Sequence, residues 1–197
     1  MELKPNDKFF IPAVGATIFN SLTITGAVTR PGLLGWFEGM RLSDVFSDIN
    51  EDLMPQVADL DFGFVERFDV DTMMWEIIPF TPLDVLVNQS AKDNLILNES
   101  DIVNFLFNDQ PRTAQIASSV NKLRAQSSNE QLSQVVTISG AVKFPGQYPI
   151  YKDSTLVDIF TAAGGFNDDA LLGSIEISRA NLVDDGLVVP SIIEISA

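Results

Sequence analysis

The sequence contains no cysteine and no histidine among its 197 residues. Without cysteine there are no disulfide bonds and no thiolate nucleophiles, and without histidine the most common general base is missing. These two residue types are also the usual zinc ligands. No G-x-x-x-x-G-K phosphate loop is present either. We therefore predict a protein that is not an enzyme, with no catalytic residues, no cofactor and no metal site.

Positive charge is also scarce, with 12 basic against 27 acidic side chains and a net charge of −15. Nucleic-acid binding needs clustered lysine and arginine, so a nucleic-acid partner is excluded. Between residues 44 and 109 the chain has 15 acidic and only two basic side chains. This region is either a solvated acidic surface or a face for cations or a basic partner. It lacks the D-x-D-x-D-G spacing of an EF-hand calcium loop.

Long hydrophobic runs are missing as well. No apolar stretch approaches the roughly 18–20 residues that span a bilayer, and Met1 is not followed by the apolar core of a signal peptide. Hydrophobic residues nevertheless make up 46% of the chain, which is enough to build a core. The 14 phenylalanines, against two tyrosines and two tryptophans, indicate aromatic core filling.

The strongest pattern in the sequence is an internal duplication. Residues 22–46 align without a gap to residues 136–160, displaced by 114 positions, and 10 of the 25 aligned pairs are identical. A match of this density indicates duplication of a structural unit. The identical pairs are Thr23/Thr137, Ile24/Ile138, Gly26/Gly140, Ala27/Ala141, Val28/Val142, Pro31/Pro145, Gly32/Gly146, Leu42/Leu156, Asp44/Asp158 and Phe46/Phe160.

Each copy predicts a strand, a turn and a second strand. Apolar residues alternate with Thr and Ser at the start of each copy, which is typical of a half-buried strand. Gly26 and Gly140 interrupt these strands, where a bulge or a close backbone approach is the usual cause. A Pro-Gly turn follows in both copies, and we expect the second strand at 35–38 and 147–152. The turn residues are Pro31, Gly32, Pro145 and Gly146.

A helix is predicted next, followed by a pair of strands. Apolar residues at i, i+3, i+4 and i+7 form one stripe in each copy, at Leu42, Val45, Phe46 and Ile49 and at Leu156, Ile159, Phe160 and Ala163. For the second helix we expect an N-cap at Asp153 or Ser154 and a stop at Gly164 and Gly165. The strand pairs are expected at 62–68 with 74–80, and at 174–180 with 187–195.

This order predicts an α+β fold with two tandem β-grasp-like repeats joined by a short helical linker. We call residues 21–108 the first repeat and residues 133–197 the second repeat. In the linker, residues 109–132, Ile116, Val120 and Leu123 share one helical face, so we expect a helix over 113–125 that either packs on a repeat or binds a partner.

A shorter echo links LKPNDKFF (3–10) to LNESDIVNF (97–105). The later copy closes the first repeat, whereas the second repeat has no such element. We therefore expect residues 1–20 to be the trailing end of an upstream repeat, and the second repeat to be truncated at its C-terminal end. The chain is then a piece of a longer protein.

Five side chains are candidate contacts to a ligand or to another subunit. Arg67 and Arg179 each lie near the end of the first strand after a helix, and each either forms a structural ion pair or binds an acidic sugar or a neighbouring subunit. Trp36, Tyr148 and Tyr151 lie around the second strand of their copy. Their rings either pack in the core or stack on sugar rings.

The pattern G-A-V-x-x-P-G, an aromatic strand, T-L-x-D-I-F-x-A-A-G-G and a later I-x-x-S-R resembles the soluble-ligand-binding β-grasp (SLBB) repeat of bacterial polysaccharide export proteins. Residues 140–165 and Arg179 match it closely. Residues 26–46 and Arg67 match less well, because the first copy lacks the Ala-Gly-Gly helix stop. Residues 97–103 fit the closing element.

The resemblance implies the periplasmic part of an outer-membrane exporter of capsular or extracellular polysaccharide, with repeats stacked into an oligomeric conduit. Implied partners are the polysaccharide, bound weakly or transiently, other export-machinery subunits and further copies of the chain. An acidic wall would favour passage of acidic polymers over their retention. The alternative is a receptor for a small soluble ligand, since related β-grasp domains bind small molecules such as cobalamin.

Overall fold

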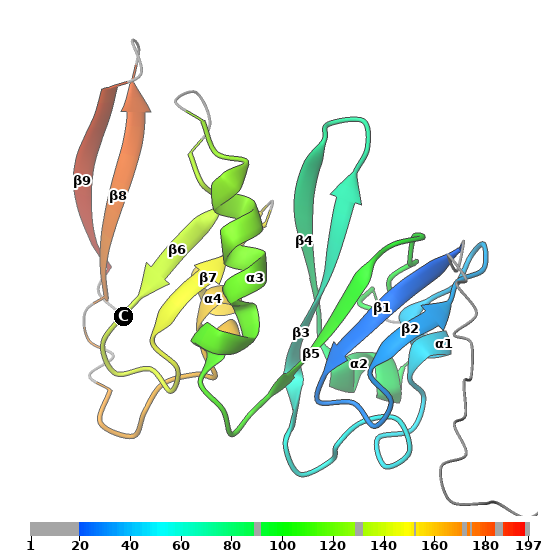
Figure 1. Ribbon diagram of the computed structural model, residues 1–197. Helices are drawn as coiled ribbons and strands as arrows, with labels where there is room; N and C mark the ends of the chain where they lie inside the picture. The colour runs from blue at the N-terminus through cyan, green and yellow to red at the C-terminus, as the bar shows by residue number, and fades with distance from the viewer. Residues whose placement is uncertain are drawn as a thin grey trace, which may run out of the picture.

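The computed structural model describes residues 20–88, 92–128, 132–151, 153–170, 173, 175–183 and 187–195. Within them the chain forms a five-stranded sheet, two separate two-stranded sheets and four helices (Figure 1). The predicted α+β class is confirmed. The echo at residues 3–10 lies outside the described residues.

The first repeat is one mixed sheet with the strand order β2-β1-β5-β3-β4. Its central strands, β1 (Ser21–Gly26) and β5 (Ile102–Phe107), run parallel. β2 (Gly32–Gly35) pairs with the outer edge of β1, and β3 (Ala58–Asp69) pairs with both β5 and β4 (Met74–Phe80). The last strand in sequence is therefore inserted between the two hairpins and joins them into one sheet.

One face of this sheet packs against two short helices, α1 (Leu42–Val45) and α2 (Pro82–Val87). The core between them is aromatic: the Phe46 ring packs edge-on against Phe105, with centroids 4.9 Å apart, and both rings contact Phe80. Burial of each such side chain contributes roughly 1.5–3 kcal/mol. The phenylalanine-rich composition thus fills the core, as predicted.

The opposite face is covered by α3 (Arg112–Ala125) and by the second repeat. Ile116, Val120 and Leu123 of α3 are buried there, together with Phe62 and Phe64 of β3. The predicted linker helix is confirmed, beginning one residue earlier, and it packs on the sheet of the first repeat. This hydrophobic cluster contains residues of β3, of α3 and of the second repeat. The first repeat and the second repeat therefore share it.

The second repeat contains β6 (Val135–Ile138), β7 (Gly146–Pro149), α4 (Leu156–Ala162), β8 (Ile175–Val183) and β9 (Leu187–Ile195). Its first hairpin reproduces β1–β2 residue for residue. Ile24 is opposite Gly32, and Ile138 is opposite Gly146; the other three pairs are displaced by the same 114 positions. The strand–turn–strand–helix geometry is thus present twice.

The two copies also begin their helices at corresponding positions. Arg41 and Thr155 are the N-cap residues, and Asp44 and Asp158 accept hydrogen bonds from the N-cap backbone. The prediction of Asp153 or Ser154 as N-cap is therefore wrong. Thr155 fits better because its Oγ1 accepts from the Asp158 N–H at the third helical position.

Two further expectations are wrong in extent. The second strand of the first copy is Gly32–Gly35 rather than 35–38, because its pairing with β1 begins directly after Pro31. The first helix ends at Val45 and Phe46 is extended, so Ile49 is not on a helical stripe. The Asp52 carboxylate accepts from the Ser47 and Asp48 N–H groups and turns the chain there.

The later strands of the second repeat depart from the first. Among the described residues, β8 pairs only with β9 and β6 only with β7, so no strand joins the two hairpins into one sheet. In α4 the predicted stop is confirmed, since Gly164 and Gly165 have φ of 78° and 83°. A complete second β-grasp-like repeat remains a prediction.

Candidate functional site

Arg67 is held by a bidentate ion pair. Its Nε and Nη2 donate to the two carboxylate oxygens of Asp101 at 3.0 and 2.7 Å, and Nη2 also donates to the Ile96 carbonyl. The hydrogen bond to Asp101 raises the pKa of Arg67. Asp101, which is 1% exposed, also accepts from the Asn98 N–H and so ties the turn before β5 to β3. In this structure Arg67 forms the structural ion pair; a contact to sugar or subunit remains a prediction.

Arg179 has a different environment from Arg67. It lies in β8 opposite Ser191, and its side chain is exposed. None of the ion pairs between described residues includes it. Two arginines that the sequence places at corresponding positions thus differ: one is neutralised by a buried carboxylate and the other faces solvent.

The three candidate aromatic residues are buried to different degrees. Trp36 packs against the core of the first repeat, and its indole N–H donates to the Leu97 carbonyl at 2.8 Å. Tyr148 is 1% exposed and donates to the Phe144 carbonyl, so its ring has no face for a sugar in this conformation. Burial raises the pKa of Tyr148 to about 12. Tyr151 is only half-buried and stays a candidate contact.

Tyr151 lies in a small pocket of about 200 Å³ between the repeats. Phe62, Thr81, Lys92 and Asp93 border the pocket from the first repeat, and Asp158 borders it from α4. Burial, followed by the Asp158 carboxylate, raises the pKa of Tyr151 to about 12. A neutral phenol beside a carboxylate can donate a hydrogen bond to a polar ligand, but here it is directed at Asp158.

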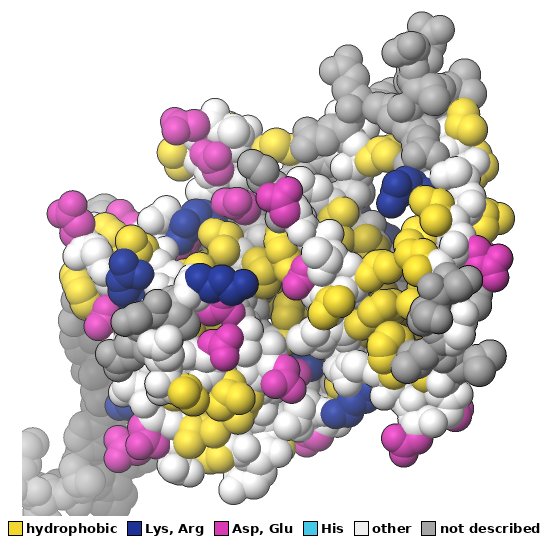
Figure 2. All heavy atoms as spheres, turned by 180° about the vertical axis from the view of Figure 1, so that it is seen from behind, with side chains coloured by type: hydrophobic (Ala, Val, Ile, Leu, Met, Phe, Trp, Pro, Cys, Tyr) yellow, Lys and Arg dark blue, Asp and Glu magenta, His cyan; other side chains and the backbone are white. Residues whose placement is uncertain are grey.

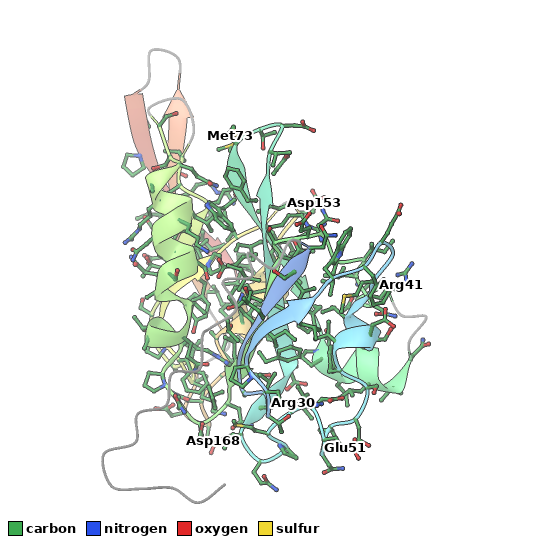
Figure 3. All side chains as sticks on the ribbon, turned by 45° about the vertical axis from the view of Figure 1, so that its right-hand side comes forward. Arg30, Arg41, Glu51, Met73, Asp153 and Asp168 are labelled. Atoms are coloured by element: carbon green, nitrogen blue, oxygen red, sulfur yellow. The ribbon has the colours of Figure 1, made fainter. Side chains whose placement is uncertain are left out.

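A larger pocket of about 460 Å³ lies at the Pro-Gly turn of the first copy. Its walls are the turn from Thr29 to Leu34, the region around α1, and Phe105 of β5. Figure 3 shows Arg30 and Glu51 on neighbouring loops at this end of the sheet. At the rim, Arg30 pairs with Asp52 at 3.3 Å.

Asp52 stabilises the loop that borders this pocket. Burial acts to raise the pKa of Asp52. Hydrogen bonds from the Ser47 and Asp48 backbone, together with Arg30, nevertheless lower this pKa below its ordinary value. The carboxylate is therefore ionised at neutral pH and already paired. In the second copy the position of Arg30 is taken by Phe144, which packs against Gly164 and Arg112.

The glycines of the duplicated segment differ in what surrounds them. Gly26 has φ of 91°, and a Cβ there would lie 1.7 Å from the Phe105 carbonyl oxygen of β5. The predicted close backbone approach is thus confirmed at Gly26. Gly140 has nearly the same φ, 96°, but nothing lies within 4 Å of the corresponding position.

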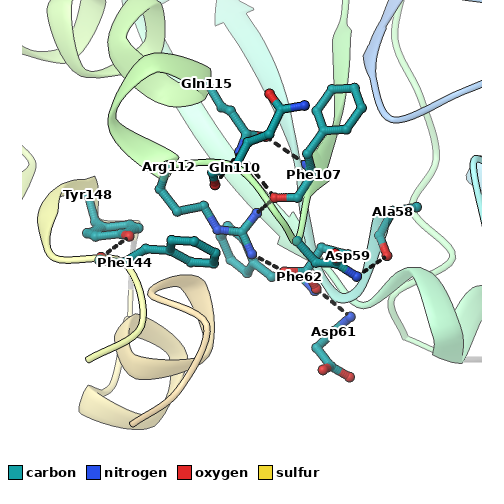
Figure 4. Close-up of polar contacts among 11 residues, drawn as sticks. Ala58, Asp59, Asp61, Phe62, Phe107, Gln110, Arg112, Gln115, Phe144 and Tyr148 are labelled. Atoms are coloured by element: carbon teal, nitrogen blue, oxygen red, sulfur yellow. Dashed lines mark hydrogen bonds and ion pairs between the residues drawn. The ribbon is translucent and has the colours of Figure 1, made fainter. Parts of the chain in front are cut away.

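The junction between the repeats contains a buried arginine that the sequence did not indicate. Arg112, at the first position of α3, forms an ion pair with Asp59 of β3 and donates to the Phe107 carbonyl (Figure 4). Its guanidinium carbon lies 4.9 Å from the centroid of the Phe144 ring in the second repeat. The Arg112 side chain is fully buried. This arginine therefore connects the sheet, the linker helix and the second repeat.

A second polar cluster lies further along α3. Glu66 of β3 accepts from the Ser119 hydroxyl at 2.7 Å and forms an ion pair with Lys122. Lys122 also lies 3.9 Å from the Trp75 ring centroid, and Asn104 of β5 bonds Glu66 from the neighbouring strand. The charged residues of this cluster follow no periodic pattern in the sequence, so the sequence did not predict their contacts. The sequence offers one hint, because Glu66 directly follows the apolar run 62–65 of β3.

The structure brings the five candidate contacts to no common site. The described part of the chain contains no cluster of three or more side chains able to hold a metal ion. None of its helices has the length and apolar character needed to cross a membrane.

The comparison with protein families gives one match. The family model described as the SLBB domain matches residues 135–190, from the start of β6 into β9. The match begins two residues after the predicted start of the second repeat and does not include the first repeat. No curated protein matches the chain.

Proposed function

We propose that this chain is a non-enzymatic periplasmic segment of a bacterial polysaccharide export protein associated with the outer membrane, contributing stacked repeats to an oligomeric conduit. The observation that carries the proposal is the SLBB match at residues 135–190, because this domain is found in polysaccharide export proteins. The repeated hairpin–helix geometry extends the argument to the first repeat.

The packing between the repeats supports a structural role. Arg112 pairs with Asp59 of the first repeat and lies over the Phe144 ring of the second repeat. Together with the shared hydrophobic cluster, these contacts fix the orientation of one repeat on the other. A wall element of a conduit needs such a rigid junction, whereas flexibly tethered binding domains do not. The absence of histidine and cysteine from the sequence also supports a role without catalysis.

The net charge of −15 supports passage of polymer over its retention. An acidic surface repels acidic polysaccharide, so we expect dissociation constants in the millimolar range or weaker, with added salt relieving the repulsion of an acidic glycan and leaving the binding of a neutral glycan unchanged. Isothermal titration of the purified chain with hyaluronate and with dextran measures this. Nanomolar affinity for a charged glycan would contradict the proposed role.

The export role itself is tested in the source bacterium. Deletion of the encoding gene should remove polysaccharide from the cell surface while its synthesis continues, and the wild-type gene should restore it. Surface polysaccharide that is unchanged by the deletion would refute the proposal.

The pocket beside the Pro31–Gly32 turn favours a second candidate, a receptor for a small soluble ligand. Its volume of about 460 Å³ lies in the range of small-molecule sites. In that case Val45→Trp, which fills the pocket from the α1 side, should abolish saturable one-to-one binding of a small molecule. Leu83→Trp on exposed α2, outside the pocket, is the matched control.

A further inference from the structure

β2 is an edge strand of the first repeat, and its outer edge is open among the described residues. The Trp36 N–H donates to the Asn20 carbonyl, and hydrogen-bonded pairs alternate along an antiparallel ladder, so the main-chain groups of Leu34 also face β1. The N–H and C=O groups of Leu33 and Gly35 therefore point away from the sheet. No other described residue bonds them, and both residues are exposed.

Two comparable strand edges are blocked. On β4, at the other side of the same sheet, the Gln126 side chain accepts from the Trp75 N–H at 2.7 Å and donates to the Trp75 carbonyl at 2.9 Å. In the second copy, β7 has Pro149 at the position of Gly35, and proline has no N–H to donate. Proteins use such devices to keep strand edges from pairing with other chains. Because Leu33 and Gly35 of β2 have neither device, this edge is suited to accept a strand.

The pocket of about 460 Å³ lies beside this edge. Leu33 and Leu34 of β2 border it on one side, and Val45 of α1 borders it on the other. Side chains of a strand point alternately to the two faces of a sheet, so a strand added to β2 would direct every second side chain into the pocket. Leu34 and Val45 are only partly buried, so an apolar side chain placed there would bury further apolar surface.

The charge around the pocket favours a basic partner. Asp44 and Asp52 border the pocket together with Arg30, which is already paired with Asp52. Glu51 adds an exposed carboxylate on the neighbouring loop (Figure 3). Figure 2 shows acidic side chains spread over the first repeat, on the left in that view. A strand bound beside β2 would therefore meet net negative charge, which attracts lysine and arginine and repels carboxylates.

We propose that the groove between β2 and α1 binds an extended segment of another protein, with apolar side chains at alternate positions and lysine or arginine at its ends. The segment adds a strand to β2. Leu33 and Gly35 supply main-chain hydrogen bonds for affinity, and the pocket receives the alternate apolar side chains for specificity. This binding uses the pocket of the small-ligand candidate, but it is independent of that role and of polysaccharide export.

A synthetic peptide, acetyl-Lys-Val-Thr-Val-Thr-Val-Lys-amide, tests main-chain recognition by isothermal titration of the full chain. It should bind saturably and with one-to-one stoichiometry. Only alternate N–H groups of an added strand face β2, in either strand direction. N-methylation of the valines and N-methylation of the threonines should therefore differ, with one set abolishing binding and the other leaving it unchanged. Equal losses from the two sets, or no saturable binding up to the solubility limit of the peptide, would overturn the proposal.

Gly35→Pro tests the same edge from the protein side. It copies Pro149 of the second copy and removes an outward N–H that takes no part in the pairing with β1. Binding of the lysine peptide should weaken at least about tenfold, because a hydrogen bond is lost and the proline ring occupies its place. Gly35→Ala is the control, since it keeps the N–H and its Cβ meets open space, so its affinity should equal that of the wild type. Equal affinities of the proline and alanine variants would contradict strand addition at β2.

A second peptide with glutamate in place of both lysines tests the charge preference. It should bind at least about tenfold more weakly than the lysine peptide at low ionic strength, and added sodium chloride should narrow the difference. Glu51→Lys should narrow it as well, because this side chain lies at the same end of the sheet as the pocket (Figure 3). Asp71→Lys changes the net charge equally, but its exposed turn lies with Met73 at the opposite end of the molecule, so it is the control. Equal affinities of the wild-type chain for the two peptides would refute the basic partner.

Discussion

Gly26 and Gly140 have almost the same φ, 91° and 96°, yet a side chain would meet different surroundings at the two positions. A Cβ at Gly26 would lie 1.7 Å from a β5 carbonyl oxygen, so β5 would have to leave the sheet. Gly26→Ala should therefore lower the free energy of unfolding by about 3 kcal/mol or more. Urea unfolding followed by circular dichroism measures this loss.

Gly140→Ala is the matched variant. Its Cβ meets open space, so only the backbone strain of about 1–2 kcal/mol opposes it in the isolated chain. Equal losses at the two glycines would mean that the close approach of β5 contributes nothing.

At the scale of single elements, local patterns predicted the strands better than the first helix. The strand pairs expected at 62–68 with 74–80 and at 174–180 with 187–195 correspond to β3 with β4 and to β8 with β9. The stripe from Leu42 to Ile49 had helical spacing, but the helix ends at Val45 because the Asp52 carboxylate binds the next backbone N–H groups. A contact from a later residue overrides periodicity, and a single sequence gives no sign of it.

The capping box of α4 makes an element-scale prediction. Burial acts to raise the pKa of Asp158, the acidic residue of this box. Hydrogen bonds with Thr155 nevertheless hold this pKa below its ordinary value of 3.8. A carboxylate whose pKa is lowered on folding stabilises the fold above its unfolded pKa and loses this effect as pH falls through its folded pKa. Asp158→Asn should therefore cost about 0.5–1 kcal/mol at pH 7 and almost nothing well below pH 3.8.

Urea unfolding of the two chains between pH 7 and pH 2.5, with Asp168→Asn as the surface control, tests this dependence. A difference between wild type and Asp158→Asn that persists undiminished at the acid end would show that the cap does not act through the ionised carboxylate.

At the scale of the whole molecule, the duplication was evident in the sequence but the way the repeats pack was not. The repeated pairs in residues 22–46 and 136–160 predicted two similar hairpins, and the registers agree. Arg112 contacts Asp59, 53 positions earlier in the chain, and the Phe144 ring, 32 positions later. No sequence pattern connects these residues. Packing between units depends on such individual contacts, so the sequence predicted the candidate arginines of each repeat but not the junction.

That junction should make the first repeat and the second repeat unfold together. Arg112→Met leaves the buried Asp59 carboxylate without its cation, and removing one partner of a buried ion pair costs about 3–5 kcal/mol. Asp59→Asn in the same chain removes that charge but keeps Oδ1, which accepts from the Asp61 and Phe62 N–H groups. The double variant should therefore recover part of the loss in a double-mutant cycle measured by urea unfolding. We expect one cooperative transition for the wild type and two separated transitions for Arg112→Met. If the free energy of unfolding of Arg112→Met lies within about 1 kcal/mol of the wild-type value, the apolar cluster alone holds the repeats together.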